Sequence, residues 1–99
     1  IANKRAGRGY QYKIAKRLGG KSVGTIEGQD ISHPLFSFEA KKRKSFVGQK
    51  FMSQAVKNCP EGKIPLVIVH ETGQSHDNDI VIIRLINWEK LIKDLKINE

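Results

Sequence analysis

Asp30, Glu39 and Lys41 are the residues of this chain whose types and spacing are best suited to chemistry. Residues 36–41 alternate between apolar or small residues and polar ones, which is typical of a half-buried strand. On such a strand Glu39 and Lys41 would share one face, roughly 7 Å apart. Asp30 comes just before a His-Pro turn, so an antiparallel return of the chain would bring its carboxylate beside Glu39.

These side chains together suit metal-assisted phosphodiester hydrolysis. Carboxylate oxygens are ligands that Mg²⁺ prefers, and a neighbouring ammonium group can stabilise a developing negative charge. We therefore expect a site that uses Mg²⁺ or Mn²⁺ to hydrolyse a phosphodiester. The alternative is a plain ion pair between Glu39 and Lys41 on a solvated surface, because so short a pattern is degenerate.

The net charge of +8 is unevenly distributed along the chain. Residues 1–50 contain 12 Lys and Arg against 3 Asp and Glu, a net of +9, whereas residues 51–99 contain 6 against 7, a net of −1. The predicted site lies in the basic half, which indicates a polyanionic partner. Basic residues interleaved with Tyr10 and Tyr12 favour nucleic acid over an anionic membrane surface. A solvated basic face is the alternative.

Hydrophobic periodicity predicts a helix, three strands, a helix, two strands and a last helix. The helices are expected at 7–18, at 46–58 and in the segment that follows Asn87; the strands are expected at 21–27, 30–32, 36–41, 64–69 and 80–85. We expect Gly19-Gly20 to end the first helix, and Ser45 and Asn87 to cap the other two. The apolar run at 64–69 predicts a strand buried on both faces.

This order predicts a single α/β domain of 99 residues. Its mixed central sheet would combine an antiparallel three-strand meander with a parallel strand, reached through a right-handed crossover helix, and further helices would flank it. No apolar run approaches the ~20 residues of a membrane span, and no signal-peptide pattern opens the chain. We therefore expect a cytoplasmic protein with no membrane partner.

The histidines and the cysteine do not form a recognisable metal motif. His33, His70 and His76 are too scattered for a zinc site of known spacing. His70 ends an apolar strand, which favours a structural histidine, and residues 76–79 are interpreted as a polar turn. Cys59 lies on the apolar face of a predicted helix, which favours a small core residue over a nucleophile.

Five short motifs follow one another along the chain. They are residues 7–11 (GRGYQ, followed by Ile14, Ala15 and Leu18), 29–31 (QDI), 38–41 (FEAK), 54–55 (QA) and 65–71 (PLVIVHE). In this order and spacing the chain resembles the PD-(D/E)XK nucleases, and within them the small archaeal-type Holliday junction resolvases and their phage relatives. The resemblance covers about residues 4–92 and implies a restriction-endonuclease-like fold.

The resemblance also implies roles for individual residues. Asp30 and Glu39 would be metal ligands, and the carbonyl oxygen of Ala40 would complete the protein's share. Lys41 would position or help to deprotonate the attacking water, and Gln54 would lie near the site. The residues implied to hold the DNA backbone are Lys4, Arg5, Arg8, Lys42, Arg43 and Lys44.

Two positions depart from the family pattern. Gln29 stands where the family motif has its proline, and Gln11 stands where these resolvases usually carry a glutamate. A glutamine carbonyl can contact a metal or its water but brings no charge, so Gln11 bears on whether one or two metals bind.

The function expected from the resemblance is metal-dependent cleavage of branched DNA, most specifically of a Holliday junction by a homodimer. A four-way junction presents two strands for symmetric cutting, which suits a two-fold dimer. The alternatives are a nuclease for flaps, nicks or duplex DNA, and a basic DNA-binding module whose catalytic site has decayed.

Overall fold

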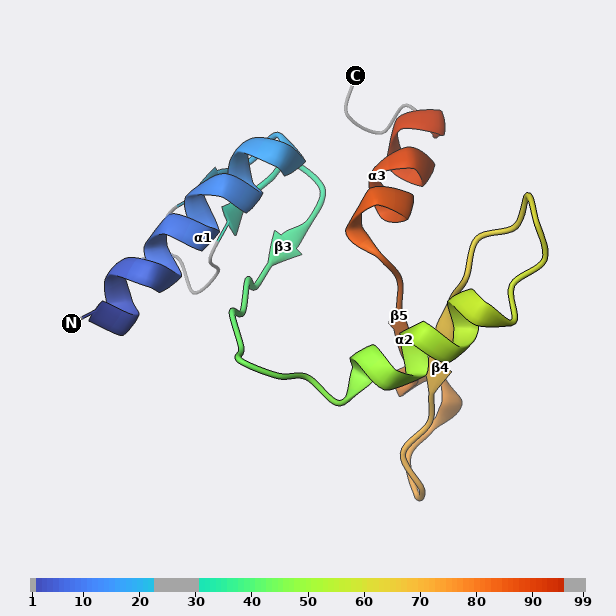
Figure 1. Ribbon diagram of the computed structural model, residues 1–99. Helices are drawn as coiled ribbons and strands as arrows, with labels where there is room; N and C mark the ends of the chain where they lie inside the picture. Colours follow the sequence, from blue (N-terminus) through green and yellow to red (C-terminus); the bar gives the residue numbers. More distant parts are fainter. Residues whose placement is uncertain (1, 23–30, 96–99) are drawn as a thin grey trace. The chain divides into compact units, whose positions relative to one another are not determined.

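The described residues form a small α/β protein with three α-helices. The computed structural model describes residues 2–22 and 31–95, and the side chains at 9–21, 31 and 33–95. The chain divides into two compact units, one containing the residues up to Lys44 and one beginning at Ser45 (Figure 1). The single-domain organisation stays a prediction.

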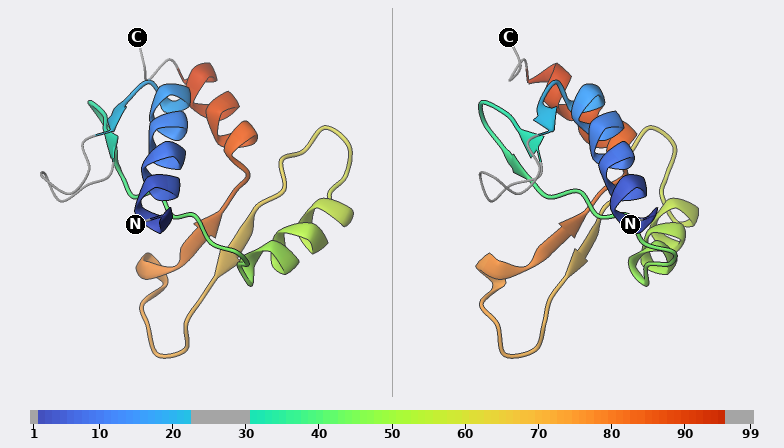
Figure 2. Two further views of the ribbon diagram at one scale, coloured as in Figure 1. Left: turned by 60° about the vertical axis from the view of Figure 1, so that its left-hand side comes forward. Right: turned by 90° about the vertical axis from the view of Figure 1, so that its left-hand side faces the viewer.

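The described residues of the first unit form one long helix and a small antiparallel sheet. Helix α1 spans Ala2–Leu18, and the strands are β1 (Lys21–Ser22), β2 (Ile31–Ser32) and β3 (Ser37–Phe38). The sheet order is β1-β2-β3 with both pairings antiparallel, which confirms the predicted meander. Helix α1 packs alongside β1 and β2 (Figure 2). Its side chains Ala15 and Leu18 are buried together with Ile31, which has no exposed surface.

Helix α1 ends at the predicted glycine pair. Gly19 has a φ of 72°, a left-handed conformation that glycine adopts without a Cβ penalty. The Gly20 N–H donates to the Ala15 carbonyl at 2.9 Å and the Gly19 N–H donates to the Lys16 carbonyl at 3.3 Å. These are the two hydrogen bonds of a Schellman motif, which satisfies carbonyls that the helix end leaves open.

Strand β3 is shorter than the predicted strand at 36–41. Phe38 pairs with Ile31, which is the first described residue of β2, so the described ladder ends at this pair. Glu39, Ala40 and Lys41 follow the strand rather than lying within it.

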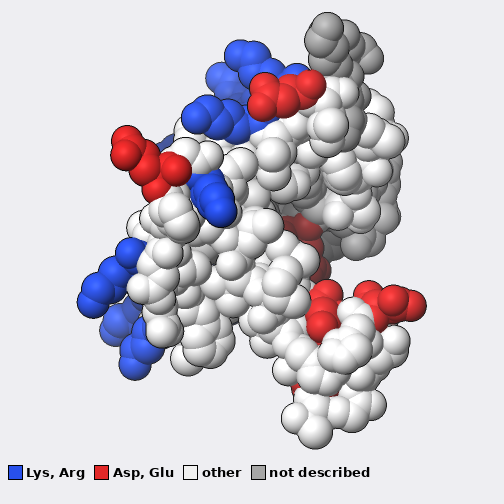
Figure 3. All heavy atoms as spheres, turned by 90° about the vertical axis from the view of Figure 1, so that its right-hand side faces the viewer, with Lys and Arg blue, Asp and Glu red and all other residues white. Residues whose placement is uncertain are grey.

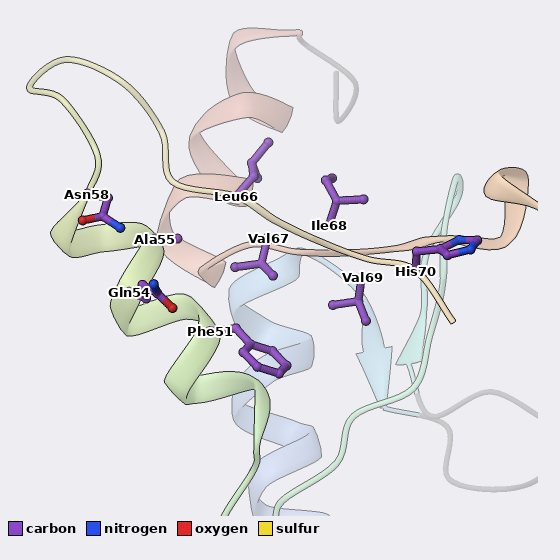
Figure 4. Close-up of a pocket in the computed structure, with 9 residues that line it drawn as sticks. All are labelled: Phe51, Gln54, Ala55, Asn58, Leu66, Val67, Ile68, Val69 and His70. Atoms are coloured by element: carbon purple, nitrogen blue, oxygen red, sulfur yellow. The ribbon is translucent and has the colours of Figure 1, made fainter. Parts of the chain in front are cut away.

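The second unit contains two helices and a β-hairpin. Helix α2 spans Gly48–Lys57, β4 spans Val67–Val69, the 3₁₀-helix η1 spans His76–Asn78, β5 spans Ile80–Ile82 and α3 spans Leu85–Asp94. Strands β4 and β5 pair antiparallel, and α2 packs against β4. Val67 and Val69 point towards α2, whereas Leu66 and Ile68 point away from it (Figure 4).

Both predicted caps in this unit are wrong. The N-cap of α2 is Val47, which makes no side-chain capping bond, and not Ser45. The N-cap of α3 is Arg84, whose carbonyl accepts hydrogen bonds from Asn87 and Trp88 at 3.0 Å. Asn87 therefore lies inside the helix, because helical hydrogen bonding starts three residues earlier than the sequence pattern indicated.

The interpretation of residues 64–69 as a strand buried on both faces is also wrong. Ile68 is 60% exposed, and Leu66 and Ile64 are exposed as well. Among the described residues β4 pairs with β5 alone, and α2 lies against one face of the hairpin. The parallel pairing of β3 with β4 would join the two units and stays a prediction. None of the described helices is both long and apolar enough to cross a membrane.

Candidate functional site

Glu39 and Lys41 form an ion pair directly after strand β3. The Lys41 Nζ lies 3.7 Å from the Glu39 Oε1, and the two side chains are 55% and 68% exposed respectively. An ion pair in this much water contributes at most ~1 kcal/mol to folding. Both groups are therefore accessible to a ligand in solution, and the stability of the unit does not require them.

Several of the predicted site residues lie outside the described part. Asp30 is one of these residues. Of the two predicted carboxylate ligands, the structure therefore describes Glu39 alone. For Lys4, Arg5 and Arg8 the structure describes the helical backbone of α1 but not the side chains. The predicted pairing of Asp30 with Glu39 stays a prediction.

Gln11 lies on the inner side of α1. It is half-buried and precedes Ala15 by four residues and Leu18 by seven, so the three side chains share the face that packs against the strands. On this helix Ala15 and Leu18 are buried, whereas Tyr10, Gln11 and Ile14 are all half-buried.

The basic loop at 42–44 is open to solvent. Lys42, Arg43 and Lys44 are all exposed, and Arg43 Nη1 lies 3.4 Å from the Lys42 carbonyl oxygen. On α1, Lys16 Nζ lies over the ring of Tyr12 at 5.6 Å from the centroid. Figure 3 shows Lys and Arg atoms at the surface of the face that it draws. The exposed side chains of Lys42, Arg43 and Lys44 are therefore accessible to a polyanion.

Gln54 lines a pocket in the second unit. The pocket has a volume of about 560 Å³ and lies between α2 and β4, with Phe51, Val67 and His70 also in its wall (Figure 4). Glu39 belongs to the other unit, so the proximity of Gln54 to Glu39 stays a prediction.

The structure also brings together three residues that the sequence did not connect. His70 Nδ1 lies 2.6 Å from Asp79 Oδ1, and His76 Nδ1 lies 3.1 Å from Asp79 Oδ2. The two imidazole rings are 4.4 Å apart between centroids. The interpretation of residues 76–79 as a polar turn agrees with the exposed 3₁₀-helix η1. Their spacing along the chain did not indicate that His70 and His76 both contact Asp79. The antiparallel register of the hairpin, rather than spacing along the chain, is the signal that would have found the cluster.

Comparisons with known proteins found no relative of this chain. No protein-family model, no curated protein and no solved structure matches the chain.

Proposed function

We propose that the protein is a metal-dependent endonuclease that acts on branched DNA. The observation that carries the proposal is the Glu39–Lys41 pair, in which a carboxylate and an ammonium lie 3.7 Å apart on an accessible surface at the end of a strand. The pair stands in the FEAK motif of the basic half, next to a loop of three exposed cations.

The register of the meander supports a second carboxylate at this place. Ser32 pairs with Ser37 and Ile31 pairs with Phe38, so the next pair in the same register would be residues 30 and 39. Directly opposed residues in an antiparallel ladder point to the same face, with Cβ atoms about 4.5–5.5 Å apart. Asp30 and Glu39 would then form the carboxylate pair that the sequence predicts.

The donor set of this pair fits a hard divalent cation. Asp30, Glu39 and the carbonyl of Ala40 offer oxygen atoms only, which suits Mg²⁺ or Mn²⁺. Such a metal, when bound, supplies Lewis acidity and bound water for phosphodiester hydrolysis. Lys41 places a positive charge beside the carboxylates, where it would stabilise negative charge that develops on a phosphate oxygen. Gln11 would contribute a neutral amide from the inner face of α1.

The basic loop supplies the means of holding DNA. Lys42, Arg43 and Lys44 follow Lys41 directly, so phosphates bound by the loop would lie next to the reacting groups. The finer proposal is a restriction-endonuclease-like mixed sheet and a homodimer that resolves four-way junctions, since a two-fold dimer would present two equivalent sites to two equivalent strands.

The second candidate is a DNA-binding module without catalysis. The exposed ion pair favours this candidate, because a surface salt bridge without any catalytic role would also hold Lys41 beside Glu39 in solvent. The absence of a charge at Gln11 agrees with this reading.

A cleavage assay separates the two candidates. The full chain is incubated with four-way, flap, nicked and linear duplex DNA, with Mg²⁺, with Mn²⁺ and with chelator. Metal-dependent, paired cuts in the four-way junction support the resolvase. Preferential cutting of another substrate keeps the nuclease and changes its target, whereas DNA binding with no cleavage in either metal supports the binding module.

A further inference from the structure

We propose that His70, His76 and Asp79 form a binding site for Zn²⁺ or a similar transition metal at the tip of the β4–β5 hairpin. One nitrogen from each imidazole and one carboxylate oxygen lie within 4.8 Å of one another. The site lies entirely within the second unit, and the proposal does not depend on the nuclease function.

The hairpin register builds the first half of the site. Val69 pairs with Ile80, so His70 and Asp79 are the next opposed pair towards the tip of the hairpin. In this position His70 Nδ1 reaches one carboxylate oxygen of Asp79 at 2.6 Å. The site is thus set by the same strand pairing that holds the hairpin together.

The 3₁₀-helix η1 builds the second half. The Ser75 side chain accepts a hydrogen bond from the Asp77 N–H, and the Asp79 N–H donates to the His76 carbonyl at 3.0 Å. This single turn brings His76 back over Asp79, where its Nδ1 lies 3.1 Å from the other carboxylate oxygen. A turn at residues 71–74, with Gly73 at a φ of 89°, reverses the chain before it.

The donor set selects the class of metal. Two imidazoles and one carboxylate suit Zn²⁺, Co²⁺ or Ni²⁺ better than Mg²⁺, which prefers oxygen ligands alone. In a tetrahedral zinc site with bonds of about 2.0–2.1 Å, ligand atoms lie roughly 3.3 Å apart. The observed contacts of 2.6 and 3.1 Å run to the two different oxygens of Asp79, and one ligand atom from each of the three residues lies within 4.8 Å of the others. Metal binding would therefore require side-chain rotations that bring the three ligand atoms to the tetrahedral spacing.

The exposure of the side chains and the number of protein ligands both indicate a metal site that is open to solvent on one side. The Asp79 side chain is only 15% exposed, whereas His76 is 84% exposed. The metal would therefore enter from solvent past His76 and meet a carboxylate whose position the hairpin holds. Three protein ligands leave the fourth tetrahedral position to water, as in zinc sites that bind or activate a further molecule.

The test is a titration of the full chain with Zn²⁺, followed by calorimetry, and with Co²⁺, followed by visible absorption. A Cys59→Ser background removes the single thiol, which is another zinc ligand. We expect one Zn²⁺ per chain with a dissociation constant in the micromolar range or tighter. His70→Ala, His76→Ala and Asp79→Asn should each weaken binding by more than about 100-fold, because the loss of outer-shell partners alone costs 10–100-fold.

Three matched variants should bind as the background protein does. His33→Ala removes the remaining histidine, Asp77→Asn removes the exposed acid of η1, and Glu39→Gln removes the carboxylate of the proposed nuclease site. If a ligand variant does not fold, NMR shifts of the His70 and His76 ring resonances in the background protein on addition of Zn²⁺ provide the readout. Absence of stoichiometric binding, or binding that survives all three ligand substitutions, would overturn the proposal and leave a metal-free hydrogen-bonded cluster.

Discussion

Ile31 of β2 lies directly opposite Phe38 of β3, and Ile31 has no exposed surface. This pair ends the described ladder of the meander, and the residue that follows Phe38 is Glu39. The packing of Ile31 against α1 therefore holds the strand from which the candidate catalytic residues emerge.

Ile31→Ala should destabilise the protein strongly. Removing a fully buried isoleucine side chain leaves a cavity, and such changes cost about 2–5 kcal/mol of unfolding free energy. Urea denaturation measures the loss. Ile68→Ala is the matched control, because Ile68 is a strand residue with an exposed side chain and its truncation should cost no more than about 0.5 kcal/mol. Equal losses in the two variants would contradict the assignment of the core.

Glu39→Gln should separate DNA binding from cleavage. The amide keeps the shape of the side chain but removes the negative charge, so cleavage in Mg²⁺ should fall by at least about 100-fold. Affinity for junction DNA should stay similar or rise, since a carboxylate that repels phosphates has been removed. Gel-shift and cleavage assays on the same preparation test both parts. Glu61→Gln, at an exposed acid of the second unit, should change neither, and full activity of Glu39→Gln would remove Glu39 from the site.

Neutralising the basic loop should flatten the salt dependence of DNA binding. The logarithm of the affinity should fall linearly with log salt, by about 0.9 per phosphate neutralised. Replacing Lys42, Arg43 and Lys44 together by glutamine should reduce this slope and the affinity at low salt. The control is the replacement by glutamine of three exposed lysines of residues 51–99, namely Lys57, Lys63 and Lys90. If the control triple reduces the salt dependence of DNA binding more than the loop triple does, DNA binds to residues 51–99 and the prediction is contradicted.

Gln11→Glu should lower the metal concentration required for half-maximal cleavage. Gln11 lies on the inner face of α1 with Ala15 and Leu18, where an added carboxylate would supply a charged ligand. Gln11→Ala should raise the required concentration without unfolding the protein. Metal titrations of junction cleavage compare the three proteins, and superimposable curves would show that Gln11 takes no part.

Two glycine substitutions in and after α1 should have opposite effects on stability. Gly9→Ala places an alanine in the helix interior with open space around its Cβ, and should raise the unfolding free energy by about 0.5–1 kcal/mol. Gly19→Ala also meets open space but forces a left-handed φ of 72° on alanine, and should lower it by about 1–2 kcal/mol. Thermal denaturation of both variants measures the difference, and a gain in stability from Gly19→Ala would rule out the Schellman ending.

The sequence by itself determined the features that depend on neighbouring residues. The order of helices and strands, the meander and the end of α1 at Gly19 all follow from local periodicity and from the φ angles that glycine permits. The FEAK motif likewise marked Glu39 and Lys41, since their closeness depends on only two residues of chain.

Tertiary structure alone decided what depends on hydrogen-bond partners and on coverage. Ser45 and Asn87 are residue types that often cap helices. A helix begins, however, where the first backbone carbonyl accepts a helical hydrogen bond, and the N-caps are therefore Val47 and Arg84. An apolar run shows that residues 64–69 can be buried, yet exposure of Ile68 follows from what lies against each face of the hairpin. The closeness of His70 and Asp79 comes from cross-strand register, which pairs residues nine apart and leaves no periodic trace in the sequence.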